Sequence, residues 1–240
     1  IMPLPKIATP TYELELPSTG QEIKYRPFLV KEEKVLVIAL ESEDPKQITT
    51  AIKTVIKNCI HTKGIKVESL PTFDIEYLFL NIRGKSVGEE LDVNIICPDD
   101  EVTEVPVTIN IDDIQIQKNE DHTNKIQLDD QITMVMKYPS LDQFIKNNFD
   151  FDDKNQMDQS FELIASCVDS ICTEEDVWAA ADCTKKEVTD FLESMNSSQF
   201  KGVEKFFETM PKLSHTISVT NPNTKVKSDV VLEGLASFFA

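Results

Sequence analysis

The sequence predicts an α+β protein in which helices pack with small antiparallel β-hairpins near the N-terminus, in the middle and near the C-terminus. Three observations point to this fold class. Apolar and polar residues alternate in those three places, apolar residues recur at helical spacing between them, and turn-forming residues separate the alternating segments. Apolar residues make up 40% of the 240 residues, which supports a folded core and argues against general disorder.

The N-terminal region predicts an extended arm, a β-hairpin and helices. Residues 1–10 contain three prolines, which indicates an extended arm. Residues 12–16 and 22–26 alternate with period two around a Pro-Ser-Thr-Gly turn, and this pattern predicts a hairpin. Asp44 before Pro45 is typical of a helix N-cap followed by a first-turn proline. Apolar residues at helical spacing predict helices in three segments: 28–40, 45–60 and 72–84.

The middle of the chain predicts antiparallel strands. Four segments are rich in alternating or β-branched residues: 91–97, 105–111, 125–128 and 132–136. Residues 98–101 form a turn between the first two segments. Pro106 lacks a backbone N–H group, and acidic residues are frequent here, so we expect these strands to lie at sheet edges.

From Pro139 onward the sequence predicts mainly helices. Ser140 is expected to cap a first helix. Thr184 with Glu187 fits a capping box at the start of a later helix. Between them, one helix is expected to carry five apolar residues on a single face: Phe161, Ile164, Ala165, Val168 and Ile171.

The last elements are a helix and a second hairpin. Ser197 or Ser198 is expected to cap this helix, and residues 215–219 and 225–232 flank an Asn-Pro-Asn-Thr turn. The elements divide the sequence into an N-terminal region with arm, hairpin and helices, a β-rich middle, and a helical region that ends in a hairpin. We expect either one continuous domain or three regions, with these bounds: 1–90, 91–138 and 139–240.

Charge and cysteine content narrow the function classes. The formal net charge of −18 disfavours binding to nucleic acid or to anionic membranes, and it favours partners with basic patches. The simpler interpretation is that the acidity only keeps the chain soluble. No segment has the apolar length of a membrane span or the pattern of a signal peptide. Five irregularly spaced cysteines do not suggest a disulfide framework, so we expect a protein made in a reducing cytoplasm.

The sequence gives no sign of catalytic or metal-binding groups. The histidines His61, His122 and His215 lie in no nucleophile or metal motif. Residues 97–100 resemble half of a zinc knuckle, but an aspartate stands where the second cysteine is required. The acidic stretches at 99–101 and 150–153 do not follow the ligand order of an EF-hand. We therefore expect no catalytic residue, no metal and no cofactor.

Adjacent aromatic residues are the best candidates for contacts with a partner. Phe206 and Phe207 are neighbours, as are Phe238 and Phe239. In a helix, neighbouring side chains point about 100° apart, so one of each pair can fill the core while the other faces outward. Exposed aromatics are common anchors of protein interfaces. The alternative is that all four lie in the core.

The ordered segments of the chain resemble a known family. Residues 16–36 read LPSTGQEIKYRPFLVKEEKVL and residues 39–44 ALESED, while the C-terminal part carries FFETMPKL at 206–213 and VLEGLASFF at 231–239. Together with CPDDEVTE at 97–104, they resemble the baseplate hub subunit family of T4-like contractile-tailed bacteriophages. The resemblance covers nearly the whole chain and implies a late protein, made in the host bacterial cytoplasm and acting in the tail baseplate. It carries over no catalytic residue.

This resemblance leads to three hypotheses. The first is a structural hub component that docks other tail proteins and is located in the virion. The second is a non-structural assembly chaperone for the hub or for the tape-measure protein. The third, an enzyme such as a cell-wall hydrolase, lacks any supporting constellation of residues. For the first hypothesis we expect these residues to contact partners: Tyr25, Phe28, Phe206, Phe207, Leu235, Phe238 and Phe239.

Overall fold

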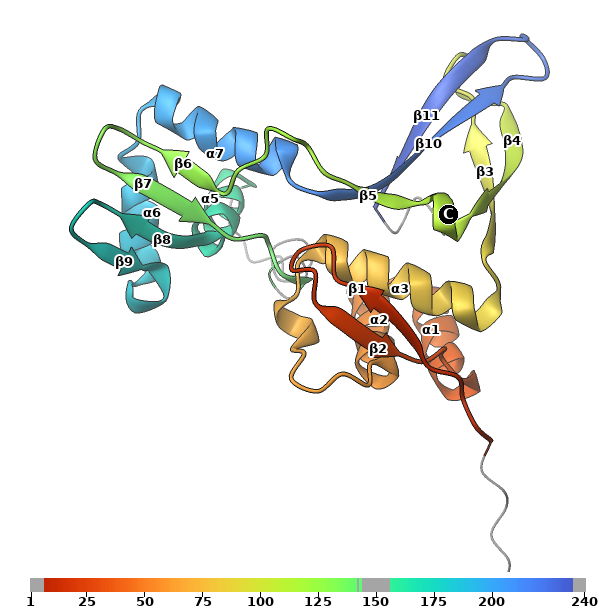
Figure 1. Ribbon diagram of the computed structural model, residues 1–240. Helices are drawn as coiled ribbons and strands as arrows, with labels where there is room; N and C mark the ends of the chain where they lie inside the picture. The colour runs from red at the N-terminus through yellow and green to blue at the C-terminus, as the bar shows by residue number, and fades with distance from the viewer. Residues whose placement is uncertain (1–6, 142, 144–155, 235–240) are drawn as a thin grey trace, which may run out of the picture. The chain divides into compact units, whose positions relative to one another are not determined.

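The computed structural model describes residues 7–141, 143 and 156–234, and Figure 1 shows their helices and strands. The chain divides into two compact units. Unit 1 is drawn from Ile1–Val67, Phe73–Gln117 and Lys212–Ala240, and unit 2 from Glu68–Thr72 and Lys118–Pro211. The mixed α+β class is confirmed, because helices and small antiparallel sheets occur along the whole chain. The three consecutive sequence regions stay a prediction.

Unit 1 begins with the expected hairpin and three helices. β1 (Tyr12–Glu15) pairs antiparallel with β2 (Glu22–Tyr25). The helices that follow are α1 (Val30–Glu41), α2 (Pro45–Cys59) and α3 (Thr72–Val87). The predicted cap of α2 is confirmed, because the side chain of Asp44 accepts a hydrogen bond of 2.9 Å from the backbone N–H of Lys46.

The remaining strands of unit 1 form two further small sheets. Their bounds are β3 (Glu90–Ile96), β4 (Glu104–Asn110), β5 (Gln115–Gln117), β10 (Lys212–Thr220) and β11 (Lys227–Glu233). β3 and β4 pair only with each other, so Pro106 lies in an edge strand as expected. The other sheet has the order β11-β10-β5. Inward-facing aliphatic residues of α3 and of these strands, such as Leu80, Leu91, Ile109 and Leu213, form one core cluster.

The described residues of unit 2 form one four-stranded antiparallel sheet and three α-helices. The strands, in sheet order, are β6 (Lys125–Gln127), β7 (Thr133–Met136), β8 (Val168–Cys172) and β9 (Val177–Ala179). The helices are α5 (Gln156–Ser166), α6 (Lys185–Glu193) and α7 (Ser197–Thr209). The capping box of Thr184 and Glu187 is confirmed at the start of α6. Phe206, Met134 and Leu192 are among the buried residues of its core.

Two expectations about unit 2 are wrong. Val168 and Ile171 do not continue the helix of Phe161, because α5 ends at Ser166 and both residues lie in β8. Pairing of β8 with β7 stabilises the strand there, and such pairing is not visible in a local pattern. The N-cap of α7 is Asn196 rather than a serine, since its side-chain oxygen accepts from two backbone N–H groups, at 2.9 and 3.0 Å.

Candidate functional site

The helix α1 exposes an unusual amount of apolar side chain. Its sequence, VKEEKVLVIALE, places apolar residues on every side of the helix. A helix of this kind is normally buried on all sides. Four of its large aliphatic residues are instead about half exposed or more: Val30 (79%), Val37 (47%), Ile38 (55%) and Leu40 (55%). We call these four residues the α1 surface.

The side of α1 that faces the core carries a buried charge. Glu32 is only 2% exposed and Ala39, seven residues later, is also buried. Because successive helical residues turn by about 100°, Val30 and Val37 lie about 160° from Glu32 and Ala39, on the opposite side. The helix is therefore inverted relative to an ordinary amphipathic helix, with a carboxylate inward and valines outward.

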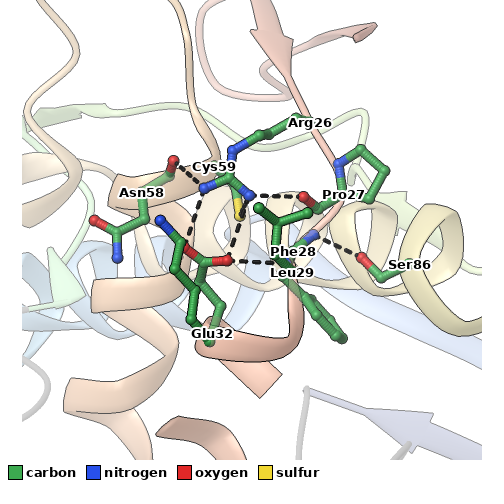
Figure 2. Close-up of polar contacts among 9 residues, drawn as sticks. Arg26, Pro27, Phe28, Leu29, Glu32, Asn58, Cys59 and Ser86 are labelled. Atoms are coloured by element: carbon green, nitrogen blue, oxygen red, sulfur yellow. Dashed lines mark hydrogen bonds and ion pairs between the residues drawn. The ribbon is translucent and has the colours of Figure 1, made fainter. Parts of the chain in front are cut away.

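Arg26 neutralises the buried carboxylate, and Figure 2 shows this arrangement. The two guanidinium nitrogens Nη2 and Nη1 donate to the two carboxylate oxygens of Glu32, at 3.0 and 3.4 Å. The same guanidinium donates to the backbone carbonyls of Asn58 (3.1 Å) and Pro27 (2.9 Å). The pair of contacts with Glu32 thus joins the end of β2 to α1, and the contact with Asn58 joins it to the last turn of α2. A paired, fork-shaped contact of this type fixes orientation as well as charge.

The carboxylate also fixes the start of α1. The backbone N–H of Leu29 donates to Glu32 at 2.9 Å, which satisfies a donor that the helix itself leaves free. Burial alone would raise the pKa of Glu32, but the hydrogen bonds from Arg26 and Leu29 and the charge of Arg26 outweigh it. The pKa of Glu32 therefore lies below its ordinary value, and the residue stays ionised at neutral pH.

Neighbouring groups complete the support beneath α1. The backbone N–H of Phe28 donates to the hydroxyl of Ser86 on α3, at 2.9 Å (Figure 2). The thiol of Cys59 lies 3.7 Å from Nη1 of Arg26, and burial raises the pKa of this thiol to about 11. A thiol with that pKa is inert rather than nucleophilic. The arrangement therefore holds α1 in place.

A shallow groove runs beside the α1 surface, between α1 and α2. Its lining combines apolar side chains (Val35, Ile38, Ala39 and Ala51) with polar ones (Gln47, Thr50 and Thr54) and two charged ones (Asp44 and Lys46). The exposed valines form a ridge beside this groove. In helix–helix packing, the ridge of one helix fits into the groove of another. The geometry fits contact with another helix better than it fits a small ligand, because the groove is shallow and its two charged residues, Asp44 and Lys46, lie at least partly in solvent.

A model of the T4 bacteriophage base plate protein family matches residues 9–240. The chain belongs to this family. Membership implies a role in the phage baseplate, as a component of the virion tail with other tail proteins as partners. No curated protein and no solved structure gives a significant match.

The residues that the sequence predicts as partner contacts differ in how deeply they are buried. Tyr25 is buried in unit 1, and Phe206 is buried in the core of unit 2. Phe28 and Phe207 are half-buried, and the rings of Phe206 and Phe207 meet edge to face with centroids 5.2 Å apart. Phe206 fills the core, and Phe207 packs against the same core cluster. The contact role of all these residues stays a prediction, and three of them lie outside the described residues: Leu235, Phe238 and Phe239.

Two of the three histidines, His122 and His215, have polar contacts with neighbouring groups. His122 lies in unit 2 between the hydroxyls of Thr209 and Tyr138, at 2.9 and 3.0 Å. Burial lowers the pKa of His122, which keeps its ring neutral. Nδ1 of His215 lies 3.1 Å from the backbone carbonyl oxygen of Asp113. Neither histidine has a carboxylate within these contacts.

The acidic turn 98–101 is a structural clamp. The side-chain amide of Asn221, which is buried, donates to Asp99 (3.1 Å) and to Asp100 (2.8 Å), and so ties the β3–β4 turn to the β10–β11 turn. Hydrogen bonds from Thr103, from Asn221 and from backbone N–H groups hold the pKa of Asp100 well below its usual range.

Two further features are absent from the residues that the structure describes. Among them, no group of three potential metal ligands comes together. None of their helices has both the length and the apolar character of a membrane span.

Sequence reasoning missed the α1 surface. Helical spacing predicts a helix over residues 28–40, but it does not show which of the apolar residues face solvent. The available signal was that apolar residues occur on all sides of the segment, together with an arginine six residues before a glutamate. Such a pair within an apolar stretch can indicate a buried ion pair, and therefore which face of the helix is inward.

Proposed function

We propose that this protein is a structural subunit of the baseplate hub and that the α1 surface is covered by another protein in the assembled tail. The observation that carries the proposal is the inverted helix, which places four large aliphatic side chains in water. Contiguous exposed apolar residues on a folded protein mark interaction sites. The resemblance of the ordered sequence segments to hub subunits supports the hub as the location.

The energy available at this surface is sufficient for a subunit contact. Fully burying a valine, leucine or isoleucine contributes about 1.5–3 kcal/mol. Residues that are already half buried, such as Val37, contribute about half of that. Four such residues on one helix supply the apolar contact area that subunit interfaces need, and the charged residues Glu33, Lys34 and Glu41 among them supply polar contacts.

Hydrogen exchange can test this proposal directly. Amide exchange is compared for α1 peptides in the free chain and in baseplates purified from infected cells. We expect side-chain burial in the baseplate to slow exchange across α1. An I38K variant should be incorporated less well than wild type, whereas V87K, which changes an equally exposed helical residue of α3, should be incorporated normally. Equal exchange in both samples and normal incorporation of I38K would contradict the proposal.

A second candidate function is an assembly chaperone for the hub or for the tape-measure protein. The net charge of −18 favours it, because such a surface attracts a basic client. A chaperone leaves before the tail matures, whereas a structural subunit remains. Finding the chain in assembly intermediates but not in mature tails would favour the chaperone.

A further inference from the structure

We propose that the α1 surface pairs with the α1 surface of a second copy of this chain, antiparallel and around a two-fold axis near Val37. This inference rests on the proposed function, since it names the protein that covers α1. It leaves the contacts with other tail proteins to other parts of the molecule. The argument depends on the order of apolar and charged residues along the outward side of α1.

The outward side of α1 carries apolar and charged residues in alternation. Val30, Lys34, Val37 and Glu41 follow one another at intervals of four, three and four residues. This spacing keeps them in one line on a helix. All four are exposed. The line has the spacing of a coiled-coil seam, in which residues of two helices interlock.

The charges along this line are complementary to themselves only in an antiparallel pair. With a rise of about 1.5 Å per residue, Lys34 lies about 4.5 Å before Val37 and Glu41 about 6 Å after it. In an antiparallel pair centred on Val37, Lys34 therefore lies opposite Glu41 of the partner subunit, and the same contact is repeated on the other side of the axis. A parallel pair would place lysine against lysine and glutamate against glutamate.

The other flank of the line fits the same arrangement. Glu33 and Leu40 lie on that flank, on the same side of α1. Around an axis near Val37, the nearest residue to Glu33 on this flank is Leu40 of the partner subunit. Glu41 of the partner subunit is at the same height as Glu33 but on the other flank, about 80° away around the helix. Neither Lys34 nor Glu41 forms an ion pair within the described residues, so both are available for a contact between copies. A surface that is complementary to itself is the defining property of a two-fold contact.

The size of the contact predicts a weak dimer. The 12 residues of α1 span about 18 Å. A pair of helices of this length buries less surface than the about 1,200 Å² at which stable interfaces begin. We therefore expect a dimer that forms only at high protein concentration in solution. In a baseplate, where copies are held close to one another, the same contact is strengthened by the high effective concentration.

Sedimentation equilibrium of the purified full chain, from low micromolar to several hundred micromolar, tests the inference. We expect wild type to dimerise with rising concentration. K34E and E41K should each weaken dimerisation about tenfold, because each single reversal puts two like-charged pairs into the contact. The double variant K34E/E41K should recover wild-type dimerisation. A mixture of K34E with E41K should form heterodimers more readily than either variant forms homodimers.

Two further variants separate this contact from unspecific association. V37K places two lysines at the axis and should abolish the dimer, whereas V87K changes an exposed helical valine outside the contact and should not. Circular dichroism of each variant shows whether its fold is intact. A monomer at every concentration, or a dimer that V37K and the charge reversals leave unchanged, would overturn the inference. If α1 is nevertheless protected in baseplates, a different tail protein covers it and the proposed function stands.

Discussion

Replacing Arg26 by methionine removes the cation that neutralises the charge beneath α1. Methionine keeps most of the aliphatic volume but none of the donors to Glu32, Asn58 and Pro27. The carboxylate of Glu32, which is 2% exposed, then keeps only the N–H of Leu29 and the Lys31 ammonium at 3.4 Å. Breaking a buried pair by removing one partner costs about 3–5 kcal/mol. We expect about 3 kcal/mol for R26M, because Lys31 still compensates part of the charge.

The pH dependence and a double variant give this prediction its control. The pKa of Glu32 lies below its ordinary value, so its paired charge stabilises the fold above the unfolded pKa of about 4.3. That stabilisation is lost as the pH falls through the folded pKa. The destabilisation by R26M should therefore be largest at neutral pH and shrink in acid. The double variant R26M/E32M leaves no unpaired charge and should recover most of the lost stability.

Urea unfolding, followed by circular dichroism, measures the total effect, and hydrogen exchange locates it. We expect faster exchange in α1 and β2 of R26M, since the lost contacts join these elements. The fluorescence of Trp178, the single tryptophan, reports on unit 2 and serves as an internal reference. A loss below about 1 kcal/mol for R26M, the level of an exposed ion pair, would refute the reasoning. An equal loss in R26M and R26M/E32M would refute it as well.

Three other predictions concern local features. D100N should lower stability at neutral pH, because the Asp100 pKa is depressed; the loss should shrink below about pH 4 in urea unfolding. G202A should lower the free energy of unfolding by about 1–2 kcal/mol, as measured by Trp178 fluorescence. The new Cβ would lie 2.6 Å from Cγ2 of Ile126, and this overpacking exceeds the gain in helix propensity. Burial raises the pKa of the Cys167 thiol to about 11, so mass spectrometry should find it unlabelled by iodoacetamide in the native protein.

Each of these predictions has a matched control. D113N changes an exposed aspartate of the same unit and should leave stability nearly unchanged. G84A should cost less than G202A, because its Cβ meets a flexible Ile111 side chain at 3.1 Å. The half-buried thiols of Cys172 and Cys183 should be labelled before that of Cys167. Equal pH dependence of D100N and D113N, a neutral G202A, or early labelling of Cys167 would contradict the respective argument.

Local signals explain which elements were predictable from the sequence. The cap of α2 at Asp44 and the box of Thr184 with Glu187 were predictable, because capping depends on residues within one helical turn. The hairpin of β3 and β4 was predictable for the same reason, since its strands are close neighbours in the sequence. These elements need no information from distant parts of the chain.

Elements that depend on distant partners were not predictable. β5 has three residues and exists because Ile116 pairs with Leu213, which lies 97 positions later (213 − 116). Val168 and Ile171 fit the spacing of a helix, but pairing with β7 makes their segment a strand. The α1 surface belongs to the same class. Its apolar residues are visible in the sequence, but only the contact between Arg26 and Glu32 decides which of them face outward.

Quantitative mass spectrometry of purified mature tails tests the central claim most directly. A structural subunit of the baseplate remains in the particle in a fixed ratio to the other baseplate proteins. We predict that peptides of this chain, including peptides from α1, occur in mature tails at a constant integer copy number. A chain that is abundant in infected cells and in assembly intermediates, yet absent from mature tails, would contradict the account.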